Sequence, residues 1–147
     1  MKATKYLLTA LFLITSVFTA QASNDKPISF AQLPEACKTF IRKHFNENNI
    51  SYAKMERDFL QRSYDVFFTN GDKVEFDRNG KWESVECRKA AVPTEIVPAK
   101  IAEYVASKFP NNYIIKIDRD RREYEVDLNN NLEIRFDLKF NVIGYDD

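Results

Sequence analysis

The sequence has few of the residues from which metal centres are usually built. Its 147 residues include two cysteines and one histidine, which is too few for a zinc site of the usual kind. A calcium-binding loop needs oxygen ligands at alternate positions and ends in a bidentate glutamate. Arg78 and Lys81 interrupt that pattern in the segment from Asp77 to Glu83. We therefore expect no metal and no cofactor.

A net charge is also lacking. The chain has 22 basic and 22 acidic residues and a formal net charge of +0 at pH 7. Nucleic acids and anionic membranes attract proteins through a surplus of basic side chains. This balance gives neither of them an electrostatic basis for binding, and we predict that the chain binds no nucleic acid.

Catalytic patterns are equally scarce. His44, near the end of the first expected helix, has no serine or cysteine motif with which to form a nucleophile–base pair. The many carboxylates alternate with lysine and arginine, as they do on solvated sheet faces. We therefore predict that the protein is not an enzyme. An uncharacterised hydrolase that uses His44 is the least favoured hypothesis.

Only one long apolar run is present, and it lies at the N-terminus. The run Tyr6–Phe18 is shorter than the about 20 residues that a membrane-spanning helix needs. Lys2 and Lys5 precede it, and a small-x-small tripeptide ending at Ala22 follows it, as in a signal peptide. We predict a signal peptide at 1–22, cleavage after Ala22, a periplasmic or secreted protein, and no membrane anchor after cleavage.

The two cysteines, Cys37 and Cys87, then lie in an exported chain. In that setting a lone pair favours a disulfide over a reactive thiol or a metal site. Closing a loop of about 50 residues would stabilise the fold by roughly 4 kcal/mol. We therefore predict a disulfide between Cys37 and Cys87.

What the sequence does contain is an internal repeat. The stretch VEFDRNGKWESVEC (Val74–Cys87) is echoed by IRFDLKFNVIGYDD (Ile134–Asp147). Apolar residues at helical spacing recur in the same order upstream of each copy. They are Cys37, Phe40, Ile41 and Phe45 before the first, and Ile101, Tyr104, Val105 and Phe109 before the second. A helix stripe and several strands that repeat in one order indicate a tandem duplication.

This duplication predicts the architecture. We expect an α+β fold of two tandem repeats, each one helix followed by a four-stranded antiparallel meander. Together they would form one sheet with both helices on one face. The predicted boundaries are a signal peptide (1–22), a flexible lead-in (23–32), repeat 1 (33–87), a linker (88–96) and repeat 2 (97–147). Alternation of apolar and polar residues along the strands would leave the second sheet face open to solvent.

These features resemble a known family. The signal peptide, the two copies, the Leu-Pro and Val-Pro pairs that begin the helices (Pro34 and Pro98), and FDxNGxW at Phe76–Trp82 are similar to the PepSY-like proteins of Bacteroidetes. That group is described as related in fold to β-lactamase inhibitor proteins. The resemblance extends over 33–147, although the second copy departs from the FDxNGxW form. It implies a small exported module that binds a partner and has no catalytic residues. Inhibition of a β-lactamase does not follow from a shared fold.

Three aromatic residues fall outside the expected core phase. Phe67 lies between core positions and should point to the open face, and Tyr52 is out of phase on its strand. Trp82 faces outward if Asn79-Gly80 is a two-residue loop, and inward if the loop has three residues. Exposed aromatics on a flat sheet are common anchors of protein interfaces. The alternative is that helix ends or the linker cover these three aromatic residues.

We therefore predict an exported, non-enzymatic binding module. It would act as a monomer and dock an unknown protein or peptide through Phe67, Trp82 and Tyr52. A periplasmic small-ligand or envelope-stress sensor that uses the groove between the repeats is the alternative hypothesis.

Overall fold

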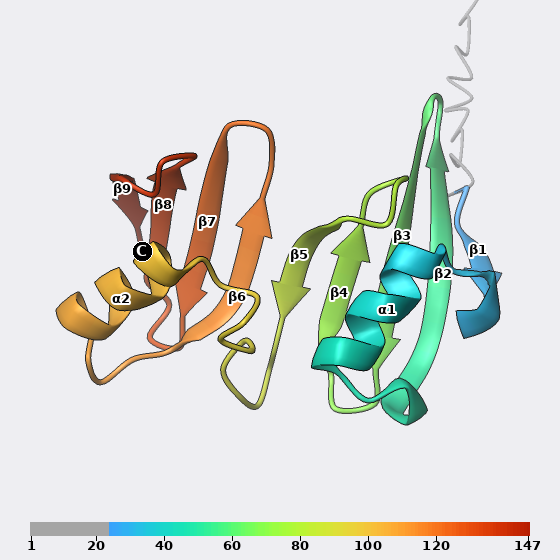
Figure 1. Cartoon of the computed structure of the whole chain (residues 1–147), viewed down its shortest axis with the longest axis horizontal. Helices are drawn as coiled ribbons and strands as arrows, with labels where there is room; N and C mark the ends of the chain where they lie inside the picture. The colour runs from blue at the N-terminus through green and yellow to red at the C-terminus, as the bar shows by residue number, and fades with distance from the viewer. Residues whose placement is uncertain (1–23) are drawn as a thin grey trace, which may run out of the picture.

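A computed structural model describes residues 24–147 (Figure 1). The expected signal peptide and its cleavage position lie outside the described residues. Within residues 24–147, no helix has the length and apolar character needed to cross a membrane.

Nine strands form one antiparallel sheet, in which each strand pairs with the next strand of the chain. The strands are β1 (Lys26–Ile28), β2 (Ile50–Asp58), β3 (Gln61–Phe68), β4 (Lys73–Phe76), β5 (Trp82–Glu86), β6 (Ile114–Arg119), β7 (Glu123–Leu128), β8 (Glu133–Asp137) and β9 (Val142–Asp146). The helices are α1 (Glu35–His44) and α2 (Ala99–Lys108), and short 3-10 turns lie at Phe30–Gln32 and Glu47–Asn49.

The predicted fold class is wrong. We expected an α+β chain built from two helix-plus-four-strand repeats with the helices on one face. The described chain is instead mostly β, a single nine-stranded sheet with two helices. Strand β5 pairs directly with β6 through Ser84 opposite Asp118 and Glu86 opposite Lys116. The repeat in the sequence indicates only the strands that occur in both copies. It does not indicate β1, which precedes the first copy and adds a ninth strand to the sheet.

The lead-in expected to be flexible contains strand β1. Lys26 lies opposite Met55, and Ile28 lies opposite Ala53 of β2. Ile28 also packs against the buried core. Pro27 fits this position because a proline lacks a backbone donor and is tolerated on an edge strand. The short strand covers the edge that the long strand β2 would otherwise expose.

Each helix contacts the sheet through an aromatic pair. Phe40 of α1 meets Phe76 of β4 edge-on, with ring centroids 5.5 Å apart. Tyr104 of α2 meets Phe136 of β8 in the same geometry at 5.6 Å. Edge-to-face contacts of this kind add to the free energy gained by burying the rings. The fully buried strand residues of the core are Val66, Val74, Phe76, Val85, Ile117, Val126, Leu128, Ile134 and Phe136.

The predicted disulfide is also wrong, because Cys37 and Cys87 are buried free cysteines. Cys37 lies beside the β4–β5 loop, where a Cβ added to Gly80 would stand 3.2 Å from its Sγ. Cys87 contacts Asp72 at the opposite end of β4. A strand extends about 3.3 Å per residue, so β4 holds the two cysteines beyond the about 7 Å that a disulfide can bridge. Burial raises the pKa of each thiol to about 12, which keeps both protonated and unreactive.

Candidate functional site

The polar face of the sheet consists of strand side chains that alternate with the buried ones. Strand pairing places them in two rows that cross the sheet from β2 to β8. The first row is Tyr52, Phe67, Lys73, Glu86, Lys116, Asp127 and Glu133, and the second is Lys54, Asp65, Glu75, Ser84, Asp118, Glu125 and Arg135. Acidic side chains outnumber basic ones in these rows, so the polar face has an acidic surplus in a chain without net charge.

Charges on the β2–β4 part of the polar face form a network of ion pairs. Asp65 is buried, and its carboxylate lies 3.1 Å from Nζ of Lys73 and 3.7 Å from Nζ of Lys54. Lys73 also bonds to Glu75, and Lys54 bonds to Glu56. Burial nevertheless raises the pKa of Asp65 above its usual value, against the opposing effect of Lys73. This network fixes the side chains of the three strands in one arrangement.

Negative charge is concentrated on the β7–β8 part of the polar face. Carboxylate oxygens of Glu125, Asp127 and Glu133 lie within 4.8 Å of one another. Burial raises the pKa of both Glu125 and Asp127, and the charge of Glu133 raises that of Glu125 further. Exposed acidic groups often gather in this way, so the cluster alone defines no cation site. It does supply the acidic surplus of the face.

Tyr52 and Phe67 come together at the β2–β3 end of the polar face. A register shift between Ile50 and Tyr52 sets Tyr52 opposite Phe67. The two rings stack with centroids 4.3 Å apart and an interplanar angle of 13°. Nζ of Lys73 lies 5.1 Å from the Phe67 centroid, a contact that the sequence analysis missed. Tyr52 remains 53% exposed, so the stack offers an ordered apolar surface to solvent.

Trp82 lies apart from this pair. The β4–β5 loop has three residues, Arg78 to Gly80, and is closed by a hydrogen bond from the Asp77 amide to the Lys81 carbonyl at 2.8 Å. A bulge next to the loop pairs Trp82 with the fully buried Phe76. Trp82 therefore turns inward and is 9% exposed.

Arg119 at the end of β6 covers the Trp82 ring. Its guanidinium carbon lies 3.8 Å from the ring centroid, and its Nε donates to the Trp82 carbonyl at 2.7 Å. Arg119 was not among the residues predicted from the sequence. The basic run from Arg119 to Arg122 was the available signal, but Trp82 lies far from it in the chain.

His44 does not form a catalytic arrangement with its neighbours. Its ring packs on Phe40 with centroids 4.7 Å apart, and Nδ1 lies 3.8 Å from a carboxylate oxygen of Glu95. Burial lowers the pKa of His44, and the adjacent Lys43 lowers it further. Neither Phe40 nor Glu95 is a nucleophile that a general base would activate.

Comparison with known proteins places the chain in a family. It belongs to the family described as "Putative beta-lactamase-inhibitor-like, PepSY-like", which matches residues 62–144. The resemblance to PepSY-like proteins is therefore confirmed. No curated protein matches the chain.

Three solved structures from Bacteroides are similar over most of the chain. A "putative periplasmic protein" of Bacteroides vulgatus is 51% identical, has a TM-score of 0.82, and is matched over 86% of this chain and 99% of its own. A "putative calcium-regulated periplasmic protein" of Bacteroides thetaiotaomicron is 50% identical, with a TM-score of 0.81 and coverage of 84% and 97%. A Bacteroides vulgatus "putative periplasmic protein of unknown function" is 32% identical, with a TM-score of 0.79 and coverage of 84% and 99%.

These relatives support a periplasmic location for the chain. Their descriptions and that of the family contain no reference to catalysis. Family and fold alone do not specify a ligand or partner, which is recognised by the surface of the individual chain.

Proposed function

We propose that the chain is a non-enzymatic periplasmic binding protein, released as a monomer by cleavage after Ala22, that docks a protein or peptide on its polar face. The observation that carries this proposal is the stacked pair of Tyr52 and Phe67 at the β2–β3 end of the polar face. The partner segment would carry an apolar side chain for the stack and basic residues for the carboxylates.

The stack suits an interface anchor because its rings are already ordered. Binding is weakened when mobile side chains must be immobilised, and Tyr52 and Phe67 hold each other in place at 4.3 Å. Tyr52 presents an aromatic surface with a hydroxyl at its tip, a combination that is common at interface hot spots. A partner's apolar side chain would remove the exposed part of this ring from water.

The acidic surplus of the polar face indicates which charge a partner should carry and how far that charge should lie from the partner's apolar residue. Asp127 lies in the same row as Phe67, four strands further along the sheet. At about 4.8 Å between strands this is about 19 Å, which an extended peptide covers with about six residues. A partner with lysine or arginine at that distance from an apolar residue would complement the face and associate faster at low salt.

Pull-down from a periplasmic extract, followed by cross-linking, tests this proposal. The bait variant Tyr52→Ser/Phe67→Ser removes the stack. The matched control Phe59→Ser/Leu60→Ser removes two apolar residues that are 96% and 80% exposed in the β2–β3 hairpin loop. Circular dichroism must show that both variants are folded. Buffers with and without calcium are compared, because one relative is described as calcium-regulated.

We expect a partner that the control variant retains in the pull-down and the stack variant does not. Lysine cross-links to that partner should start at Lys54, Lys73 and Lys116 on the polar face. Equal loss with both variants, or cross-links confined to other lysines, would contradict the proposal. Sedimentation of the purified chain tests for self-association. If the chain associates with itself through Tyr52, the occupant of the polar face is a second copy of the chain and not another protein.

A further inference from the structure

A cleft lies at one end of the sheet, away from the Tyr52–Phe67 stack. Its volume is about 950 Å³, and it is lined by the β2–β3 hairpin, the β4–β5 loop and the β6–β7 hairpin. In Figure 1 this end is at the top, where the two hairpins rise on either side of the start of β5. Six cations line the cleft, namely Arg62, Arg78, Lys81, Arg119, Arg121 and Arg122. We call this site the cationic cleft.

Carboxylates near the cations of the cleft, such as Asp120 near Arg122 and Glu83 near Arg119, lie beyond ion-pair distance. Among residues 24–147, none of the six forms an ion pair within 4.0 Å. On the polar face, by contrast, Lys54, Lys73, Lys116 and Arg135 are all paired. Unpaired cations on three neighbouring loops repel one another, and a bound anion would relieve that repulsion.

The acidic residues of the cleft are occupied by loop closure. One carboxylate oxygen of Asp77 accepts the amides of Asn79 at 2.8 Å and Lys81 at 3.0 Å. One oxygen of Asp120 accepts the amide of Arg122 at 2.7 Å, and backbone hydrogen bonds of this kind lower the pKa of Asp120. These carboxylates hold the backbone of the loops that carry the arginines. Glu83 is the remaining acid of the cleft.

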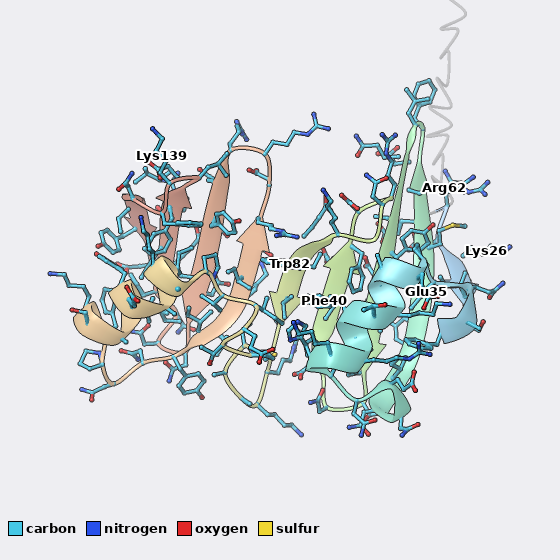
Figure 2. The ribbon with its side chains drawn as sticks, viewed as in Figure 1. Lys26, Glu35, Phe40, Arg62, Trp82 and Lys139 are labelled. Atoms are coloured by element: carbon cyan, nitrogen blue, oxygen red, sulfur yellow. The ribbon has the colours of Figure 1, made fainter. Side chains whose placement is uncertain are left out.

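Arg119 and Trp82 form the ordered floor of the cleft. Figure 2 labels Trp82, which begins β5. The guanidinium stacks on the indole at 3.8 Å and uses Nε to bond the Trp82 carbonyl. That geometry leaves the Nη donors of a fixed, planar fork for a ligand. Arginine forks of this kind bind carboxylate and phosphate groups through two parallel hydrogen bonds. Lysine, as a point charge, lacks this geometry.

We infer that the cationic cleft binds a small soluble oxyanion that carries two or more carboxylate or phosphate groups. A single charged group cannot reach cations on three separate loops, so the ligand needs several. The volume of 950 Å³ is at the upper end of the range for small-molecule sites, about 300–1,000 Å³. Tyr124, which also lines the cleft, provides apolar surface for the carbon skeleton. The site is separate from the proposed protein-docking face.

Tryptophan fluorescence provides a direct test, because Trp82 is the single tryptophan of the chain. The chain without residues 1–22 is titrated with citrate and with pyrophosphate, and with sodium chloride at the same ionic strength. Phosphatidylglycerol vesicles form a separate arm for anionic lipid headgroups. We expect a saturable change in emission with at least one of the two soluble anions and none with sodium chloride.

Two sets of variants locate the site. Arg62→Gln/Arg121→Gln/Arg122→Gln removes three exposed cations of the cleft and should weaken binding by about tenfold or more. The matched control replaces Lys26, Lys89 and Lys139, which are exposed and lie elsewhere, by glutamine. It removes the same charge and should change the affinity by less than about twofold. Arg119→Lys keeps the charge but loses the fork, and should also weaken binding by about tenfold.

Several results would overturn the inference. One is an emission change that sodium chloride reproduces, and another is equal weakening by the cleft and control variants. Binding to vesicles but to neither soluble anion would reassign the cleft to a lipid surface. An absence of binding by calorimetry with both anions, in a chain that circular dichroism shows to be folded, would remove the site altogether.

Discussion

The polar face and the cationic cleft differ in whether their cations are paired with carboxylates. On the face, cations of neighbouring strands lie beside carboxylates, as Lys73 lies 3.1 Å from Asp65. In the cleft, Arg62, Arg121 and Arg122 line one cavity without an ion pair among the described residues. The chain has no net charge. The acidic surplus of the polar face is therefore offset by basic residues elsewhere, and those of the cleft are among them.

Sheet geometry explains the difference. Strand pairing brings side chains of adjacent strands to about 5 Å, which is close enough for opposite charges to pair. Loops that leave the sheet diverge, and their aspartates accept backbone hydrogen bonds instead, as Asp77 and Asp120 do. A neutral chain therefore presents an acidic surface at one place and a basic one at another. Each can recognise a ligand of opposite charge.

The largest expected effect is that of Gly80→Ala, which should disturb the cleft and spare the face. Gly80 has φ +78°, and a Cβ there would lie 2.9 Å from Cβ of Ala36. Backbone strain and the clash with α1 should lower the free energy of unfolding by about 2–4 kcal/mol. Urea denaturation measures this change.

Gly71→Ala is the control for that substitution. Gly71 also has a positive φ, +92°, but its added Cβ would meet the flexible end of Arg88 at 3.2 Å. Only the backbone strain remains, so the loss should be about 1 kcal/mol. Equal losses for the two glycines would show that contact with α1 does not position the β4–β5 loop.

Arg119→Gln should have the second largest effect. It removes the stacking on Trp82 and the charge-assisted hydrogen bond to the Trp82 carbonyl. Together these should lower the free energy of unfolding by about 2 kcal/mol. Arg121→Gln, which removes the same charge from an exposed loop residue, should change it by less than about 0.5 kcal/mol. If both variants behave alike in thermal unfolding, Arg119 is not the ordered floor of the cleft.

Lys73→Met and Lys81→Met compare a paired cation with an unpaired one. Lys73 contacts the buried carboxylate of Asp65 at 3.1 Å, so its removal should destabilise the fold by about 1–2 kcal/mol. Lys81 lines the cleft and forms no ion pair with any residue of 24–147. Relief of repulsion among the arginines should therefore leave stability unchanged or slightly raised. Chemical denaturation of both variants at low salt measures the contrast. A loss at Lys81 as large as that at Lys73 would contradict the division of charge.

Local patterns in the sequence were sufficient to predict which side chains of a strand lie on each face of the sheet. Val66, Phe67 and Phe68 alternate along β3; Val66 and Phe68 are buried, and Phe67 packs on Tyr52 instead. A period of two follows directly from strand geometry. The phase of an aromatic residue within one regular strand is therefore predictable.

Features that depend on loop geometry or on residues far apart in the chain were not predictable in this way. The bulge next to Trp82 is one extra residue, and it reverses the side to which the indole points. The number of cysteines indicated a bridge, but only the pairing of β4 shows that Cys37 and Cys87 lie at its opposite ends. The cationic cleft draws on three loops that are far apart in the chain. Each arginine by itself has the character of an ordinary surface residue.

The smallest expected effect tests the acidic end of the polar face. Burial and the charge of Glu133 raise the pKa of Glu125 above its usual 4.5. The ionised carboxylate is therefore less favourable in the folded chain than in the unfolded one, and this cost is present at pH 7. It disappears as the pH falls through the raised pKa and below 4.5, because the group is then protonated in both states.

Glu125→Gln should accordingly raise the melting temperature at pH 7, with a gain in stability of less than about 1 kcal/mol. The gain should vanish in scans at pH values below the usual pKa of 4.5. Glu103→Gln removes an exposed charge of α2 and serves as the control, with no gain expected at either pH. A gain that persists in acid would show that repulsion among the carboxylates is not its cause. A loss at pH 7 would mean that the acidic end of the face is held by attraction, as the β2–β4 end is.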